Sequence, residues 1–157
     1  MAHRPSMDFE TYSEAGFEWD ESTQKYRGPE GASQGKKGLP VIGAAKYSEH
    51  PSTEVLTLKY DVGQGMKFWR PGMPNPVDLF AVPVVEAWNS GFEYWIWNNV
   101  CVPKYGWPPR PIEGFYDAMA KSRAHSLPAK RAAKSCSCGR SAASAATRRI
   151  GMRTEDL

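Results

Sequence analysis

The sequence has few cysteines and lacks a long apolar run. Only three of its 157 residues are Cys. Cys136 and Cys138 stand one residue apart, which does not suggest a disulfide framework. The pair could be half of a metal site, but no His or Cys pair with zinc-type spacing is near it. No stretch of about 18 consecutive apolar residues occurs, so the sequence predicts no membrane-spanning helix and no membrane partner.

The first residues also lack the apolar stretch of a secretion signal, since they read Met-Ala-His-Arg-Pro-Ser-Met. We therefore expect a cytoplasmic protein. Hydrophobic residues make up 41% and aromatic residues 12% of the chain. This composition favours a packed globular body over a disordered chain, and the length is that of one domain.

Positive charge is concentrated at the C-terminal end. Residues 119–157 contain nine Lys or Arg and two acidic residues, whereas residues 1–118 contain eleven Lys or Arg and fifteen acidic residues. A basic segment of this kind is typical of a nucleic-acid-binding tail and equally of a solvated, poorly ordered terminus. From about residue 130 the Ala/Ser/Arg-rich texture shows no apolar periodicity, which favours the second interpretation.

The rest of the chain predicts an α/β domain. Strands are expected at 7–12, 39–47, 55–60, 66–69 and 82–88, a helical turn at 77–81, a helix opening at Asn89, and a strand passing into a helix over 115–124. Residues 13–38 have loop composition. This order, strands followed by strand–helix units, indicates a mixed sheet flanked by helices.

Two acidic motifs stand out. Asp8-Phe9-Glu10 places two carboxylates at i and i+2, so that they share one face of a strand. Carboxylates that close together repel unless a cation lies between them, and hard cations such as Mg²⁺ or Mn²⁺ prefer these oxygen ligands. Two solvated charges at a strand end would give the same pattern.

The second motif runs from Trp88 to Glu93, where an apolar strand meets a helix. Asn89 is a good N-cap, and Glu93 stands four residues later on the same side of the helix start. The positive end of the helix dipole favours an ionised carboxylate there. A plain capped helix with an acidic first turn is the alternative interpretation.

Together, the two motifs resemble ribonuclease-H-like 3′→5′ exonucleases with four acidic metal ligands. Those enzymes have Asp-x-Glu on the first strand and Asn-x-x-(Phe/Tyr)-Asp at a strand-to-helix junction, and this chain has Glu93 in place of the usual Asp. Within that class, the resemblance is closer to the exonuclease region of phage family A DNA polymerases. The similarity covers about residues 7–128 and includes the stretches at 8–13, 50–56, 68–72, 89–97 and 118–128.

The resemblance implies a ribonuclease-H-like mixed sheet and a two-metal mechanism using Mg²⁺ or Mn²⁺. Asp8, Glu10 and Glu93 would be the catalytic metal ligands, and the substrate would be a single-stranded DNA 3′ end in proofreading during replication. Asn89 would orient the site or the substrate. Phe92 would pack at the edge of the site, with a plain core role equally open.

The sequence departs from that family in three ways. Residues 3–7 are poor strand sequence, the stretch from Asp78 to Trp88 is short for a helix plus a strand, and no Tyr-x-x-x-Asp or His-x-x-x-x-Asp motif follows Glu93. We therefore expect residues 1–128 to be a partial exonuclease-like domain, incomplete at its C-terminus and weakly active or inactive. Residues 129–157 would be a disordered basic tail, and the polymerase domain would be absent. The expected location is then a bacterial or phage-infected cell.

Two alternatives stay open. The chain could be a nucleic-acid-binding protein without catalysis, with Tyr105 and Trp107 stacking on bases, although these rings also suit core packing. It could also be a non-functional phage or prophage relic.

Overall fold

The computed structural model describes residues 4–32 and 36–125. It divides into two compact units, Met1–Met119 and Ala120–Leu157. The elements below all belong to the first unit. The expected tail at 129–157 and the Cys136–Cys138 pair lie outside the described residues.

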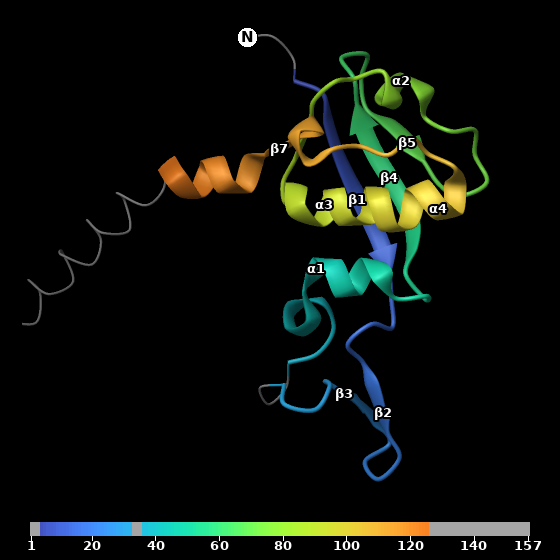
Figure 1. Ribbon diagram of the computed structural model, residues 1–157, viewed down its shortest axis with the longest axis vertical. Helices are drawn as coiled ribbons and strands as arrows, with labels where there is room; N and C mark the ends of the chain where they lie inside the picture. The colour runs from blue at the N-terminus through green and yellow to red at the C-terminus, as the bar shows by residue number, and fades with distance from the viewer. Residues whose placement is uncertain (1–3, 33–35, 126–157) are drawn as a thin grey trace, which may run out of the picture. The chain divides into compact units, whose positions relative to one another are not determined.

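A five-stranded mixed sheet forms the centre of the first unit (Figure 1). Its strands are β1 (Ser6–Tyr12), β4 (Glu54–Asp61), β5 (Lys67–Trp69), β6 (Val85–Ala87) and β7 (Phe115–Asp117), in the order β5-β4-β1-β6-β7. β4 is antiparallel to both β1 and β5, whereas β6 is parallel to both β1 and β7. The prediction of an α/β fold with a mixed sheet flanked by helices is confirmed.

Helices cover the sheet on the side that Figure 1 shows in front. α3 (Ser90–Ile96), the π-helix η1 (Trp97–Cys101) and α4 (Val102–Tyr105) follow one another without a break and cross in front of β1 and β4 (Figure 1). α1 (Leu39–Glu49) contacts α3 and η1. Two short helices, α2 (Val77–Phe80) and the 3₁₀ turn η2 (Ile112–Gly114), precede β6 and β7.

The core is built around aromatic rings. Trp107, which is 2% exposed, has ring-centroid distances of 4.8 Å to Trp97, 4.9 Å to Trp69 and 5.2 Å to Phe80. Phe9 of β1 joins this cluster, with its ring centroid 6.0 Å from that of Trp107. Edge-to-face aromatic pairs add roughly 0.5–1.5 kcal/mol each beyond the area they bury. Trp107 therefore has the core-packing role that the sequence left open for it, and its ring is not available to stack on bases.

The segment 39–47, expected as a strand, is the helix α1. Pro40 is well placed in the first turn of a helix, where its missing N–H has no intrahelical acceptor to lose. Gly43 has φ 79° and kinks the helix. The apolar pair Val41–Ile42 before it therefore lies in a helical turn and does not start a strand. This local chemistry outweighs the β-propensity on which the expectation rested.

The segment 13–38, expected as loop, contains a second sheet. β2 (Glu18–Asp20) and β3 (Lys25–Arg27) form an antiparallel hairpin. Asp20 caps its turn by accepting from the backbone N–H of Ser22 at 2.9 Å. The hairpin lies beyond the C-terminal end of β1 in Figure 1. Its strands have only three residues each, so they fall below the length at which strand patterning is readable.

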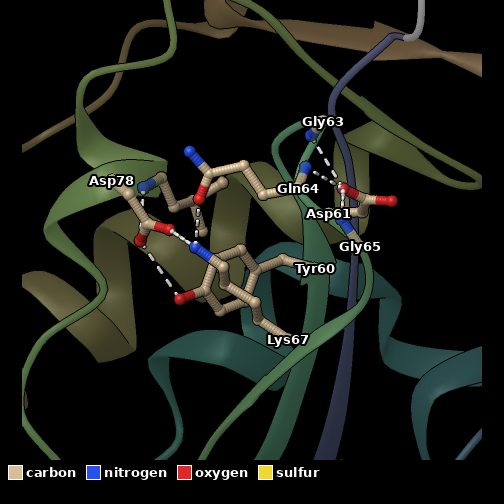
Figure 2. Close-up of polar contacts among 8 residues, drawn as sticks. Tyr60, Asp61, Gly63, Gln64, Gly65, Lys67 and Asp78 are labelled. Atoms are coloured by element: carbon tan, nitrogen blue, oxygen red, sulfur yellow. Dashed lines mark hydrogen bonds and ion pairs between the residues drawn. The ribbon is translucent and has the colours of Figure 1, made fainter.

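A polar network joins α2 to the β4–β5 hairpin (Figure 2). Lys67 donates to Asp78 Oδ2 at 2.6 Å, and the Tyr60 hydroxyl donates to Asp78 Oδ1 at 3.1 Å. The Lys67 ammonium and the other donors hold the pKa of Asp78 below its usual value, while burial and then Asp78 raise the pKa of Tyr60 to about 12. Asp61 closes the hairpin loop by accepting three backbone N–H groups, those of Gly63, Gln64 and Gly65. These acidic residues therefore hold the fold together.

Among the described residues, no helix is both long enough and apolar enough to cross a membrane.

Candidate active site at the edge of the first strand

Strand β1 separates its apolar and acidic side chains onto two faces. Met7 and Phe9 are buried, whereas Asp8 and Glu10 are exposed. The backbone alternation of a strand produces this split, and it places the two carboxylates on one face as the sequence predicts. Lys59 of β4 is the cross-strand partner of Asp8 and is also exposed.

The pairing between β1 and β6 is short, which brings Glu93 to β1. The two strands pair only at Ser6 and Glu86, and β6 ends at Ala87. The chain then turns through Trp88 and Asn89 into α3, whose first turn carries Glu93. Past that single pair, α3 contacts β1, and its Glu93 carboxyl group faces the Phe9 backbone N–H.

Glu93 is buried beside the two exposed carboxylates. Only 3% of its surface is exposed, and its Oε2 atom is buried without a hydrogen-bond partner among the described residues. Burial, followed by the negative charge of Asp8 and then that of Glu10, raises the pKa of Glu93 to about 8. The Phe9 backbone N–H faces the carboxyl group and opposes this rise. At neutral pH and without a cation, the Glu93 side chain is therefore mostly protonated.

The donor atoms suit a hard divalent cation, but they are not gathered in advance. The carboxylates of Asp8, Glu10 and Glu93 offer the oxygen ligands that Mg²⁺ and Mn²⁺ prefer. Among the described residues Glu93 Oε2 has no hydrogen-bond partner, and a bound cation would be a partner for it. However, over residues 4–32 and 36–125 no three His, Cys, Asp or Glu side chains are grouped closely enough to hold an ion. Like charges without a counter-ion repel, so an open arrangement is expected in the metal-free chain. The metal centre stays a prediction.

Asn89 is the N-cap residue of α3 as predicted, but its side chain makes no capping hydrogen bond. Its backbone oxygen accepts from the N–H groups of Phe92 at 2.9 Å and Glu93 at 3.3 Å. The side chain is exposed and available to a substrate. Phe92 is half-buried and packs on Tyr47 of α1, with ring centroids 5.9 Å apart, which is the core role left open for it.

A fourth acidic residue lies at the same end of the sheet. Asp117 ends β7, where it is the parallel partner of Ala87, and its Oδ2 accepts from the Ser90 hydroxyl at 3.1 Å. The carboxyl ends of parallel strands are the usual location of ligand sites in α/β sheets. Sequence reasoning did not place Asp117 in the site, because only the β6–β7 pairing brings it next to the start of α3. An Asp at the end of a short strand was the one available signal.

The chain was compared with known proteins, and no protein-family model, curated protein or solved structure matches it.

Proposed function

We propose that this chain is part of a ribonuclease-H-like 3′→5′ exonuclease domain of the kind found in phage family A DNA polymerases. Its reaction would be metal-dependent hydrolysis of the terminal phosphodiester at a DNA 3′ end. One observation carries the proposal: a buried carboxyl group, Glu93, lies at the edge of β1 under the influence of the Asp8 and Glu10 charges. Burial of an ionised carboxyl group beside two other carboxylates is unfavourable in free energy, and a bound cation is the simplest way to offset that penalty.

Each residue has a distinct task in this proposal. Asp8 and Glu10 are exposed and would bind the ions first. Glu93 would then lose its proton and complete the ligand set. When bound, a pair of divalent ions supplies an activated water and stabilises the leaving 3′ oxygen. Lys59, opposite Asp8, would contact a substrate phosphate as a point charge. Asn89 would contact the nucleotide with its free side chain.

The proposed activity is weak, because part of the family's machinery has no counterpart in the sequence. None of Tyr94, Tyr105 and Tyr116 has an Asp four residues later, and His125 has none five residues later. These motifs supply the residue that orients the attacking water and the fourth carboxylate. Loss of a positioned acid–base group alone typically costs about 10²–10⁴ in rate.

Divalent-ion binding is the most direct test. We expect the chain to bind Mn²⁺ in calorimetric titration at pH 8, and Asp8→Asn or Glu93→Gln to weaken that binding by tenfold or more. Glu113→Gln is the matched control, because Glu113 is exposed in η2 and belongs to no proposed ligand set. Equal Mn²⁺ affinity in all four proteins would refute the site.

A further inference from the structure

A cluster of exposed aromatic rings lies next to the candidate site and has no role in the proposed chemistry. Tyr12 is 51% exposed, Trp19 46% and Tyr26 56%, and Phe17 is exposed as well. The Tyr26 ring contacts the other hairpin rings, with centroid distances of 5.1 Å to Trp19 and 6.4 Å to Phe17. Burial against the core therefore does not explain this cluster, and the rings hold one another in place.

The aromatic cluster borders a shallow hollow. Tyr12, Ser13, Glu14, Phe17 and Tyr26 line a space of about 200 Å³. Pockets that enclose small molecules run from about 300 to 1,000 Å³, so this hollow is too small to enclose a cofactor. It is suited to a flat partner that lies against the rings, and a nucleobase has that shape.

Cationic side chains flank the rings. The Lys37 ammonium lies 5.9 Å from the Phe17 ring centroid and donates to the Tyr26 backbone oxygen at 3.5 Å. Lys25 is exposed on β3, next to Tyr26. Arg27 is paired with Glu18 at 3.1 Å and is less available. Ammonium groups beside stacking rings are the combination that single-stranded nucleic acid binds, through its phosphates and its bases.

The aromatic cluster is continuous with the acidic face of β1. Asp8, Glu10 and Tyr12 alternate on the exposed side of the strand. Alternate residues of a strand are about 6.5–7 Å apart. A strand of DNA whose last phosphate lies at Asp8 and Glu10 would thus bring a preceding base to Tyr12 and the hollow. The Tyr12 hydroxyl donates to Glu14 Oε1 at 3.2 Å, and Glu14 offers an acceptor to the edge of a base.

We propose that the ring cluster Tyr12, Phe17, Trp19 and Tyr26 is a stacking platform for the unpaired bases next to a single-stranded DNA 3′ end. This inference rests on the proposed exonuclease function, since that function supplies DNA as the partner. Stacking on aromatic rings tolerates any base, which suits an enzyme that removes whichever nucleotide is last. A duplex end would not bind in this way, because its bases are already stacked.

The test measures DNA binding without catalysis. The full chain is titrated in EDTA against a 5′-fluorescein-labelled oligothymidylate, and fluorescence anisotropy gives Kd. Stacking is worth about 1–3 kcal/mol per base, and 1.4 kcal/mol corresponds to a factor of ten. We therefore expect Trp19→Ala with Tyr26→Ala to raise Kd tenfold or more. Ile112→Ala is the matched control, because Ile112 is a 47% exposed apolar side chain in η2 and should change Kd less than about twofold.

Two more variants separate stacking from loss of the hairpin. Trp19→Phe and Tyr26→Phe keep a ring at each position and should keep Kd within about threefold. The wild-type chain should also bind a blunt duplex of the same length at least tenfold more weakly than the single strand. The proposal is overturned if the double Ala variant binds like wild type, or if the duplex binds equally well.

The outcomes also distinguish this inference from the proposed function. Glu113→Gln should leave metal-free binding of the oligonucleotide unchanged, because Glu113 lies outside both the platform and the acidic face of β1. Ring-dependent DNA binding in a chain that never binds Mn²⁺ would support the platform and refute the metal site. Mn²⁺ binding that is lost in Asp8→Asn, together with DNA binding that does not depend on the rings, would support the metal site and refute the platform.

Discussion

Glu93 on α3 and Asp8 on β1 are coupled through charge, although they lie far apart in the sequence. Burial first, and the negative charge of the Asp8 carboxylate second, raise the pKa of Glu93 to about 8. The coupling exists because β6 leaves β1 after a single paired position, which lets α3 approach the strand.

Stability in the absence of metal should fall as pH rises. The pKa of Glu93 goes from its ordinary value of 4.5 to about 8 on folding. Between these values the folded chain holds a proton that the unfolded chain has lost, so the free energy of unfolding decreases with pH. At about 1.4 kcal/mol per pKa unit the loss is several kcal/mol. Urea unfolding in EDTA at pH 5.5 and pH 8.5 measures it. Glu93→Gln should flatten this dependence, and an equally steep fall in that variant would assign it to other groups.

Cation affinity should rise with pH over the same range. An ion that binds Glu93 must displace its proton, so affinity should increase about tenfold per pH unit below 8 and then level off. Calorimetric Mn²⁺ titrations in two buffers of different ionisation heat would detect close to one released proton per ion at pH 7. If no proton is released there, Glu93 is not a ligand.

Removal of the buried Trp107 ring should lower the free energy of unfolding far more than removal of the exposed Trp19 ring of the β2–β3 hairpin. Trp107→Ala should destabilise the chain by about 3–5 kcal/mol, the usual range for a buried aromatic residue. Trp19→Ala should change stability by less than about 1 kcal/mol, because Trp19 is nearly half exposed. Chemical denaturation of both variants at pH 6 tests this, and similar losses would mean that the aromatic core is wrongly placed.

Nuclease activity should be slight and confined to the acidic site. With a 3′-labelled single strand and Mn²⁺, we expect little or no nucleotide release, because no water-orienting Tyr or His motif follows Glu93. Any release should disappear in Asp8→Ala and persist in Glu113→Gln. Robust activity that depends on Asp8 would show that another residue supplies the fourth ligand, and Asp117→Asn would then be the next variant to assay.

Strong local patterns were readable from the sequence. The alternation in Asp8-Phe9-Glu10 predicted the exposed pair, and the β-rich stretch before Asp61 predicted β4 and its hairpin with β5. Asn89 was recognised as a helix start because a polar residue followed a short apolar strand. In each case a few neighbouring residues decide the local conformation.

The remaining features depend on pairings that a single sequence does not reveal. The segment at 39–47 has β-branched residues that favour a strand and a Pro suited to a first helical turn, and the packing of Tyr47 against α3 adds to the preference for the helix. The Gly and Pro residues around Trp107 were compatible with base stacking and with core packing alike, and only the tertiary structure shows that its ring fills the core. Asp117 lies next to the start of α3 because β7 pairs with β6, and no local pattern encodes that pairing.

The early end of the β1–β6 pairing has a further consequence for association between molecules. A strand edge without a partner is a template for another chain, and proteins protect such edges with charge or with a covering element. Here the Glu93 carboxyl group of α3 faces the Phe9 N–H, and the exposed carboxylates of Asp8 and Glu10 flank that position. The groups proposed to bind ions therefore also discourage edge-to-edge aggregation. Variants that remove all three carboxylates at once would lose that protection together with the site.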